Sequence, residues 1–149
     1  MTFYRLDYVA SAHVECSGDP GVIDGSTTEF YLDYTPHREV IGRYGIYALT
    51  EPLAELVVEH GFSGCHFEAA VSLVSSHADP EIEISLPELR RLVADGVFME
   101  DDFAEKDGDL IVSQSAYDLM VARDPEIAIY TRQLREDGTP IVRAGWSVS

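Results

Sequence analysis

Residues 50–74, TEPLAELVVEHGFSGCHFEAAVSLV, decide the fold class, because they place a helix directly before a strand. Thr50 suits a helix cap, and Pro52 is tolerated in the first helical turn. The apolar residues that follow recur at helical spacing on one face: Leu53, Leu56 and Val57. Gly61 is a typical stop signal. Residues 65–74 then alternate as a strand does, with one face formed by Phe67, Ala69, Val71 and Leu73.

The segments on either side extend this pattern. Further strands are predicted at residues 2–10, 28–34, 110–112, 127–134 and 140–148. A short helix is predicted at residues 86–94, after Pro87, and a second clear helix after a cap at Ser113 or Ser115. Loops are predicted at residues 13–26, 76–84 and 100–109, and a hairpin turn at Asp137-Gly138. Because strands and helices do not alternate regularly, we expect an α+β fold, with a mostly antiparallel sheet and two or three helices packed on it.

The size and composition of the chain are those of an ordinary globular protein. Its 149 residues predict a single domain over residues 1–149, and 46% of them are hydrophobic. A chain of this size can build a core without disulfides or metals. The two cysteines, Cys16 and Cys65, are too few for a secreted disulfide scaffold.

The charge is strongly negative, with 27 acidic residues against ten basic ones and a formal net charge of −17. Such a surface repels nucleic acid, anionic lipid and acidic substrates, and it favours a basic protein partner. One alternative is that the acidic residues only keep the protein soluble. Another is that they imitate the phosphates of a nucleic acid. Residues 1–7 lack the pattern of a signal peptide, and no apolar run has transmembrane length, so we expect a cytoplasmic protein with no membrane partner.

Catalytic and metal-binding patterns are weak. His13-x-x-Cys16 and Cys65-His66 together offer the ligand types of zinc, but neighbouring residues on a strand point to opposite faces. The glycine-rich residues 18–21 lack the Lys-Ser or Lys-Thr of a phosphate-binding loop. We therefore assign no catalytic residue, no metal ligand and no cofactor, and expect a binding protein. The alternative is a small hydrolase or transferase that uses a carboxylate or the Cys65 thiol.

Negative charge is concentrated between residues 76 and 109, where eleven acids face three bases, giving 3 − 11 = −8. The densest part, residues 100–109, is either a solvated loop or a contact surface that steers a cationic protein. Phe103 is either an apolar anchor for the partner or a core residue that pins the loop. The predicted partner-binding residues are Glu100, Asp101, Asp102, Phe103, Glu105, Asp107 and Asp109.

Four segments occur in an order that resembles a known family. They are GFSGCHFE at residues 61–68, LPELRRL at 86–92, DDF at 101–103 and LIVSQSA at 110–116. This order is similar to that of small acidic bacterial proteins assigned as immunity proteins of polymorphic toxin systems. The resemblance covers residues 61 to about 120, and it implies a non-catalytic inhibitor that binds a toxin domain and blocks its active site. Many such toxins carry basic surfaces, which an acidic inhibitor matches electrostatically.

Overall fold

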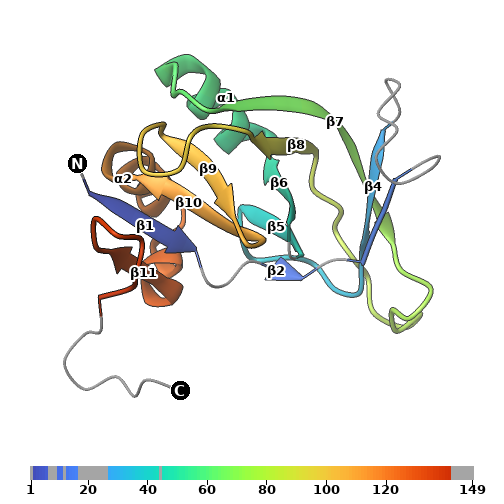
Figure 1. Ribbon diagram of the computed structural model, residues 1–149. Coiled ribbons are helices and arrows are strands. Elements are labelled where there is room, and N and C mark those ends of the chain that lie inside the picture. The colour runs from blue at the N-terminus through green and yellow to red at the C-terminus, as the bar shows by residue number, and fades with distance from the viewer. Residues whose placement is uncertain (1, 7–9, 12, 17–26, 44, 142–149) are drawn as a thin grey trace. The chain divides into compact units, whose positions relative to one another are not determined.

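The computed structural model describes residues 2–6, 10–11, 13–16, 27–43 and 45–141 (Figure 1). The first strands are β1 (Phe3–Leu6), β2 (Ala10–Ser11), β3 (His13–Cys16), β4 (Thr28–Leu32), β5 (Val40–Arg43) and β6 (Ile46–Thr50). Helix α1 (Glu51–His60) precedes β7 (Cys65–Val74), β8 (Leu89–Ala94), β9 (Phe103–Lys106) and β10 (Asp109–Ser113). Helix α2 (Gln114–Arg123), the 3-10 helix η1 (Pro125–Tyr130) and β11 (Thr131–Leu134) follow.

These strands form two sheets, and the α+β prediction is confirmed. One sheet has the strand order β11-β1-β10-β9, and the other has the order β2-β5-β6-β8-β7-β4-β3. The pairings are mostly antiparallel; β2 with β5 and β4 with β7 are parallel. Within the described ranges, no helix is both long and apolar enough to span a membrane.

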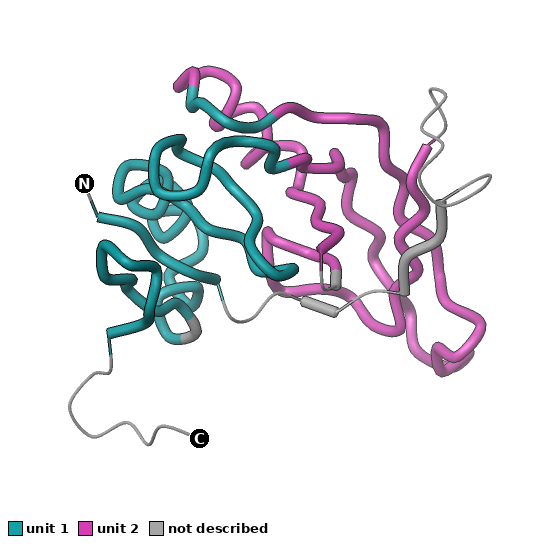
Figure 2. The backbone as a smooth tube through the Cα atoms, viewed as in Figure 1, with its two compact units in different colours: residues 1–8, 62–65, 94–149 teal, residues 9–61, 66–93 magenta. Residues whose placement is uncertain are grey.

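The chain divides into two compact units (Figure 2). Unit 1 contains residues 1–8, 62–65 and 94–149, and unit 2 contains residues 9–61 and 66–93. The chain passes from one unit to the other four times. The expectation of a single domain over residues 1–149 stays a prediction.

Unit 1 is built around the four-stranded sheet. Strand β1 pairs antiparallel with β10 on one side and with β11 on the other. A core cluster of this unit contains Phe3, Ala104, Ile111 and Leu134. Apolar residues from the beginning, middle and end of the chain are thereby removed from water together.

Residues 100–109 do not form the predicted loop, because most of them belong to a hairpin. Strand β9 pairs with β10 so that Lys106 faces Asp109 across a two-residue turn. The turn residues, Asp107 and Gly108, have φ values of 53° and 85°. Positive φ at both positions is typical of the tight turn that Asp-Gly favours between antiparallel strands. The dipeptide was therefore a hairpin signal within the acidic segment.

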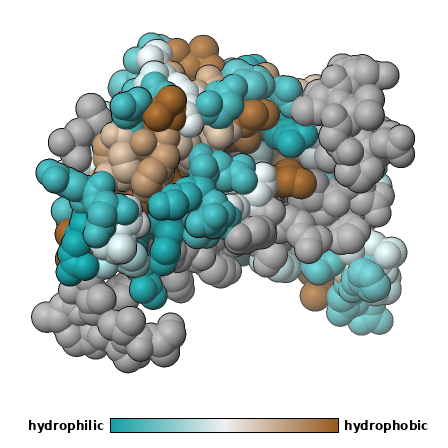
Figure 3. All heavy atoms as spheres, in the orientation of Figure 1, coloured by the Kyte–Doolittle hydropathy of each residue, from teal (hydrophilic) through white to brown (hydrophobic). Residues whose placement is uncertain are grey.

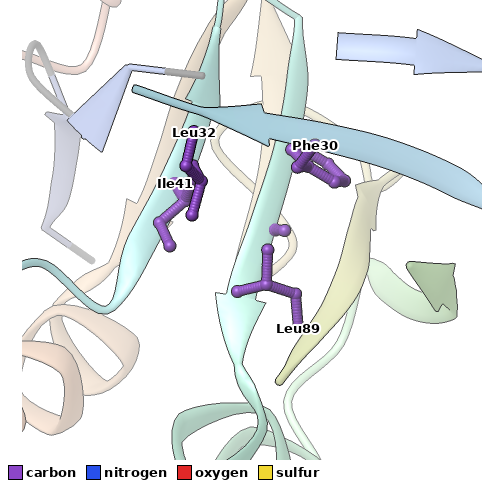
Figure 4. Packing of buried hydrophobic residues seen from close by; sticks show 5 residues of the cluster. Phe30, Leu32, Ile41 and Leu89 are labelled. Carbon is purple, nitrogen blue, oxygen red and sulfur yellow. The ribbon is translucent and has the colours of Figure 1, made fainter. Parts of the chain in front are cut away.

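Unit 2 confirms the predicted strand at residues 28–34 over most of its length. On β4, Thr28, Phe30 and Leu32 are buried and alternate with half-buried residues. Phe30 and Leu32 pack in one cluster with Ile41 and Leu89 (Figure 4). Strands β5 and β6, which contribute to this cluster, were not predicted from the sequence.

The strand predicted at residues 65–74 is confirmed as β7, but its apolar face is not its most buried one. Val71 is 38% exposed, whereas the neighbouring Ser72, on the opposite face, is 8% exposed. The Ser72 hydroxyl donates a hydrogen bond of 2.5 Å to the carbonyl of Pro87. A serine can be buried there because its hydroxyl has a partner.

The prediction of a helix at residues 86–94 is wrong, because residues 89–94 form strand β8. This strand pairs antiparallel with β6, with Leu92 opposite Tyr47. The carbonyl of Glu88 accepts the Glu51 amide at 2.9 Å, and that of Pro87 accepts the Ser72 hydroxyl. Both carbonyls are used by other segments, so the Leu-Pro start signal does not continue into a helix.

Three other predicted segments need correction. Residues 13–16, expected in a loop, form β3, which pairs with β4. The strand expected at 127–134 begins at Thr131, because Pro125 opens η1 and the Thr131 hydroxyl donates to the Ile127 carbonyl at 2.6 Å. In the strand expected at 2–10, β1 and β2 are separate, and residues 7–9 lie outside the described ranges. The same holds for residues 17–26 and for most of the strand expected at 140–148.

The helix ends follow the sequence signals closely. Thr50 occupies the cap position of α1, although its hydroxyl donates to Glu39 Oε1 at 3.1 Å and accepts no hydrogen bond from the amides of the first helical turn. Gly61 ends α1 in the left-handed conformation. Ser113 is the cap of α2, since its Oγ accepts the amide of Ala116 at 3.3 Å. The turn at Asp137-Gly138 is also present, with Leu134 bridged to Pro140.

Candidate functional site

The predicted partner-binding residues divide into an internal group and an exposed group, both in unit 1. Phe103 is fully buried, and its ring meets that of Phe62 edge-on, with centroids 6.0 Å apart. Of the two roles considered for Phe103, the core role is therefore the one observed. Asp101 and Asp102 are half-buried, whereas Glu100, Glu105 and Asp107 are exposed.

Asp102 joins three segments of unit 1. Its Oδ2 accepts the backbone amide of Ser63 at 3.0 Å and the Ser63 hydroxyl at 3.3 Å. Its Oδ1 accepts the Ser113 hydroxyl at 2.6 Å. The carboxylate thus holds the segment after α1 against the end of β10 and the start of α2. Hydrogen bonds to an ionised carboxylate are among the stronger ones in proteins.

Asp101 fixes the turn that precedes the hairpin. Its Oδ2 accepts the amide of Val97 at 2.6 Å. Next to it, Gly64 and Gly96 approach so closely that a Cβ on Gly64 would lie 2.3 Å from the Phe103 carbonyl oxygen and 2.9 Å from Gly96 Cα. Glycine is needed at both positions because no side chain fits between these backbones.

The exposed carboxylates stand on a rigid support, which we call the acidic hairpin: β9, its turn and β10, residues 103–113. Glu105 lies on β9 and Asp107 in the turn, both exposed, and Asp109 is half-buried. The only base of this hairpin, Lys106, has its Nζ 4.4 Å from the centre of the Phe98 ring. Phe98 in turn lies against Gly138. A cation over an aromatic face is attracted to it, which favours this placement of Lys106.

The exposed residues of the acidic hairpin, Glu105, Lys106 and Asp107, are all charged. On the face shown in Figure 3, hydrophilic residues cover much of the described surface and apolar residues lie between them. Glu105 and Asp107 contribute two of the 27 acidic residues that give the chain its net charge of −17. A fixed group of carboxylates on such a chain attracts a basic protein surface and raises its association rate.

Cys65, the alternative nucleophile, does not have the environment of a reactive thiol. Partial burial, with the nearby charges of Asp95 and Asp102, raises the pKa of Cys65 to about 11. The reactive form of cysteine is the thiolate, which a raised pKa disfavours at neutral pH. The neighbouring His66 is exposed, and its Nε2 lies 3.4 Å from Glu68 Oε2.

The structure describes the side chains of only part of the candidate zinc pattern. His13 and Cys16 lie on β3, and the positions of their side chains are outside what the structure describes. Cys65 and His66 begin β7, where Cys65 is half-buried and His66 exposed. Among the described side chains, no group of three histidine, cysteine, aspartate or glutamate residues could hold a metal ion.

The residues that support the site through contacts between distant segments were not predicted from the sequence. Ser63 binds Asp102, although the two are far apart in the chain, and no local pattern predicts this contact. The close approach of Gly64 and Gly96 is also non-local. The chain matches no protein-family model, no curated protein and no solved structure.

Proposed function

We propose that this protein is a non-catalytic binding protein that inhibits a basic protein partner, in the manner of a cytoplasmic immunity protein neutralising a bacterial toxin domain. The observation that carries the proposal is the arrangement of the acidic hairpin. Its core residue Phe103 and the adjoining Asp102 are fixed internally, and this leaves Glu105 and Asp107 exposed at a turn of defined geometry.

Rigidity matters because binding costs less when a contact surface is already ordered. Carboxylates on a flexible loop would lose conformational freedom on complex formation. The ladder between β9 and β10 already fixes the backbone at Glu105, and the Asp107-Gly108 turn fixes it at Asp107. The order of the sequence segments that resembles immunity proteins supports the same class of function.

The alternative of a cysteine-dependent hydrolase or transferase receives less support. A catalytic thiol needs a lowered pKa or an adjacent base. Burial, together with the nearby charges of Asp95 and Asp102, raises the pKa of the Cys65 thiol instead, which is opposite to the requirement. The raised pKa favours a binding protein over an enzyme that uses the Cys65 thiol as its nucleophile.

The test uses the purified protein and the purified product of the adjacent gene, with association rates measured at low and high salt. The variant Glu105→Gln/Asp107→Asn removes two exposed charges. Its control, Glu55→Gln/Glu59→Gln, removes two exposed charges from α1.

We expect a complex that weakens with salt, and an association rate reduced about three- to tenfold at low salt by the hairpin variant. The control variant should change it less. The proposal fails if no complex forms with the neighbouring product, and the hairpin assignment fails if both variants behave alike.

A further inference from the structure

A hollow of about 340 Å³ is formed by residues of unit 2, and none of its lining residues belongs to the acidic hairpin. Its apolar wall combines part of β7 with the segment that leads into β8, and includes Ala70, Val71, Leu86 and Pro87. Glu51 and Glu88 add carboxylates to the lining. The hollow therefore combines an apolar wall with acidic groups.

The walls of this hollow are held in place by hydrogen bonds. Ser72 donates to the Pro87 carbonyl, which fixes the segment before β8 against β7. The amide of Ser85 donates to the Thr35 hydroxyl at 2.8 Å and holds the beginning of that segment. A ligand would thus enter a hollow that is already formed, which lowers the cost of binding.

Two apolar residues of the wall remain accessible to solvent. Val71 is 38% exposed and Leu86 is 40% exposed. Other residues of the same two segments are buried: Ser72, next to Val71, and Leu89, three residues after Leu86. The aliphatic stem of a long side chain would cover such a surface and leave its charged end at the rim.

The two carboxylates differ in how well they are compensated. Glu51 Oε1 lies 3.2 Å from Arg90 Nη2, and Glu51 is the first residue of α1, where the helix end is positive. Glu88 is exposed and forms no ion pair with any described side chain. Its backbone carbonyl bonds to the Glu51 amide at 2.9 Å, so its position beside α1 is fixed. Glu51, Arg90 and Glu88 together carry a net charge of −1, and the carboxylate without an opposite charge among them is that of Glu88.

We propose that this hollow is a second contact site that accepts an arginine side chain from an extended, apolar segment of the basic partner. The arginine stem lies on Val71, Leu86 and Pro87, and its guanidinium meets the Glu88 carboxylate. Arginine fits because its planar fork pairs with a carboxylate through two parallel hydrogen bonds. The inference rests on the proposed function, since it assumes a basic protein partner. A second copy of this chain is a poor occupant, because each copy carries a net charge of −17.

The test follows backbone amide signals by NMR while the full chain is titrated with a capped pentapeptide, acetyl-Ala-Val-Arg-Val-Ala-amide. The same peptide with citrulline in place of arginine keeps the shape and removes the charge. Signals of residues 70–72 and 86–89 should shift with the arginine peptide and saturate near millimolar concentrations, as a contact through one side chain implies. The citrulline peptide should bind about three- to fivefold more weakly.

Two variants locate the interaction. Glu88→Gln should weaken binding of the arginine peptide by the same three- to fivefold, because the substitution removes the carboxylate that has no ion-pair partner among the described side chains. Its control is Glu83→Gln, an exposed acid of the same segment that is not part of the hollow, and it should leave binding unchanged. Val71→Thr keeps the side-chain shape, adds a hydroxyl to the apolar wall, and should also weaken binding.

Several outcomes would overturn the inference: no localised shifts at about 10 mM peptide, equal binding of the citrulline peptide, or unchanged binding by the Glu88→Gln variant. Failure of the proposed function gives a different pattern. In that case the arginine peptide still binds this hollow, while no complex forms with the product of the adjacent gene. Conversely, the protein could form a complex with the neighbouring product, with an affinity that Glu88→Gln does not change, and still fail to bind the peptide. That result would support the proposed inhibitor function and reject the arginine site in this hollow.

Discussion

The Ser113 hydroxyl donates a hydrogen bond of 2.6 Å to Asp102 Oδ1, while its oxygen accepts the amide of Ala116 in the first turn of α2. One serine therefore caps a helix and connects it to a carboxylate of the acidic segment. This relationship separates the acidic residues by role, because Asp102 holds the fold together while Asp107 faces solvent.

Replacing Asp102 with alanine should destabilise unit 1. The substitution leaves the hydroxyls of Ser63 and Ser113 and the Ser63 amide without their carboxylate partner. We expect a loss of about 2 kcal/mol in the free energy of unfolding, measured by urea denaturation, because hydrogen bonds to a charged group contribute about 1.5–3 kcal/mol. Asp107→Asn is the matched control and should stay within about 0.5 kcal/mol of the wild type. Equal stability of the two variants would contradict the role given to Asp102.

The glycines test steric exclusion separately from backbone conformation. Gly61 has a φ of 68° and open space around its Cβ position, whereas a Cβ at Gly96 would lie 2.2 Å from the Phe103 carbonyl oxygen. Gly64 combines both constraints, with a φ of 81° and a Cβ position 2.3 Å from the same oxygen. We expect Gly61→Ala to cost about 1–2 kcal/mol, and Gly64→Ala to cost clearly more. Urea denaturation checks this order, which is wrong if the Gly64 variant is no less stable than the Gly61 variant.

The Cys65 thiol should react slowly in the folded protein. Its pKa is about 11, against an ordinary value of 9.0, so near pH 8 it holds about 100-fold less thiolate than the unfolded chain. Alkylation by iodoacetamide, in a Cys16→Ser background so that one thiol is followed, should be slower by that order in buffer than in urea. Comparable rates in both conditions would restore Cys65 as a candidate nucleophile.

The same thiol should make stability depend on pH in the alkaline range. The folded pKa of Cys65 is raised, so the folded state binds the proton more tightly between pH 9 and 11. The contribution to stability is complete below pH 9 and is lost as the pH rises through 11. Cys65→Ala should therefore reduce the loss of stability in this range, measured by urea denaturation at several pH values. If the two proteins lose stability in parallel, the assigned pKa is wrong.

The pKa of Asp137, in the turn at residues 137–139, should be lowered, and the lowering should depend on the Thr139 hydroxyl. Hydrogen bonds from the Thr139 hydroxyl and amide, at 2.6 and 2.9 Å, lower the pKa of Asp137 from its ordinary value of 3.8. This interaction contributes to stability above pH 3.8 and is lost as the pH falls through the folded pKa. Thr139→Val should return the pKa toward 3.8, as followed by NMR titration of the Asp137 side chain. An unchanged pKa would assign the effect to the backbone amide alone.

The candidate site could be predicted only in part. Its composition was visible, since residues 100–109 are the densest acidic segment of the chain. The Asp107-Gly108 dipeptide also carried the hairpin signal, because few residues adopt positive φ at two successive positions. The internal role of Asp102 depends on Ser63, which reaches it only after folding, and no local pattern specifies such a contact. The hollow beside Glu88 likewise joins α1, β7 and the segment before β8.

Features that depend on interactions among a few neighbouring residues could be predicted from the amino-acid sequence. These include the start and end of α1, a serine cap of α2 at Ser113 or Ser115, the alternation on β4 and the strong acidity of the chain. The conformation of residues 89–94, in contrast, depends on contacts between distant segments, because these residues follow a helix start signal but pair with β6 as a strand. The physical reason is that helix signals are worth fractions of a kcal/mol per residue, whereas strand pairing and burial of Leu89 and Leu92 are collective and larger.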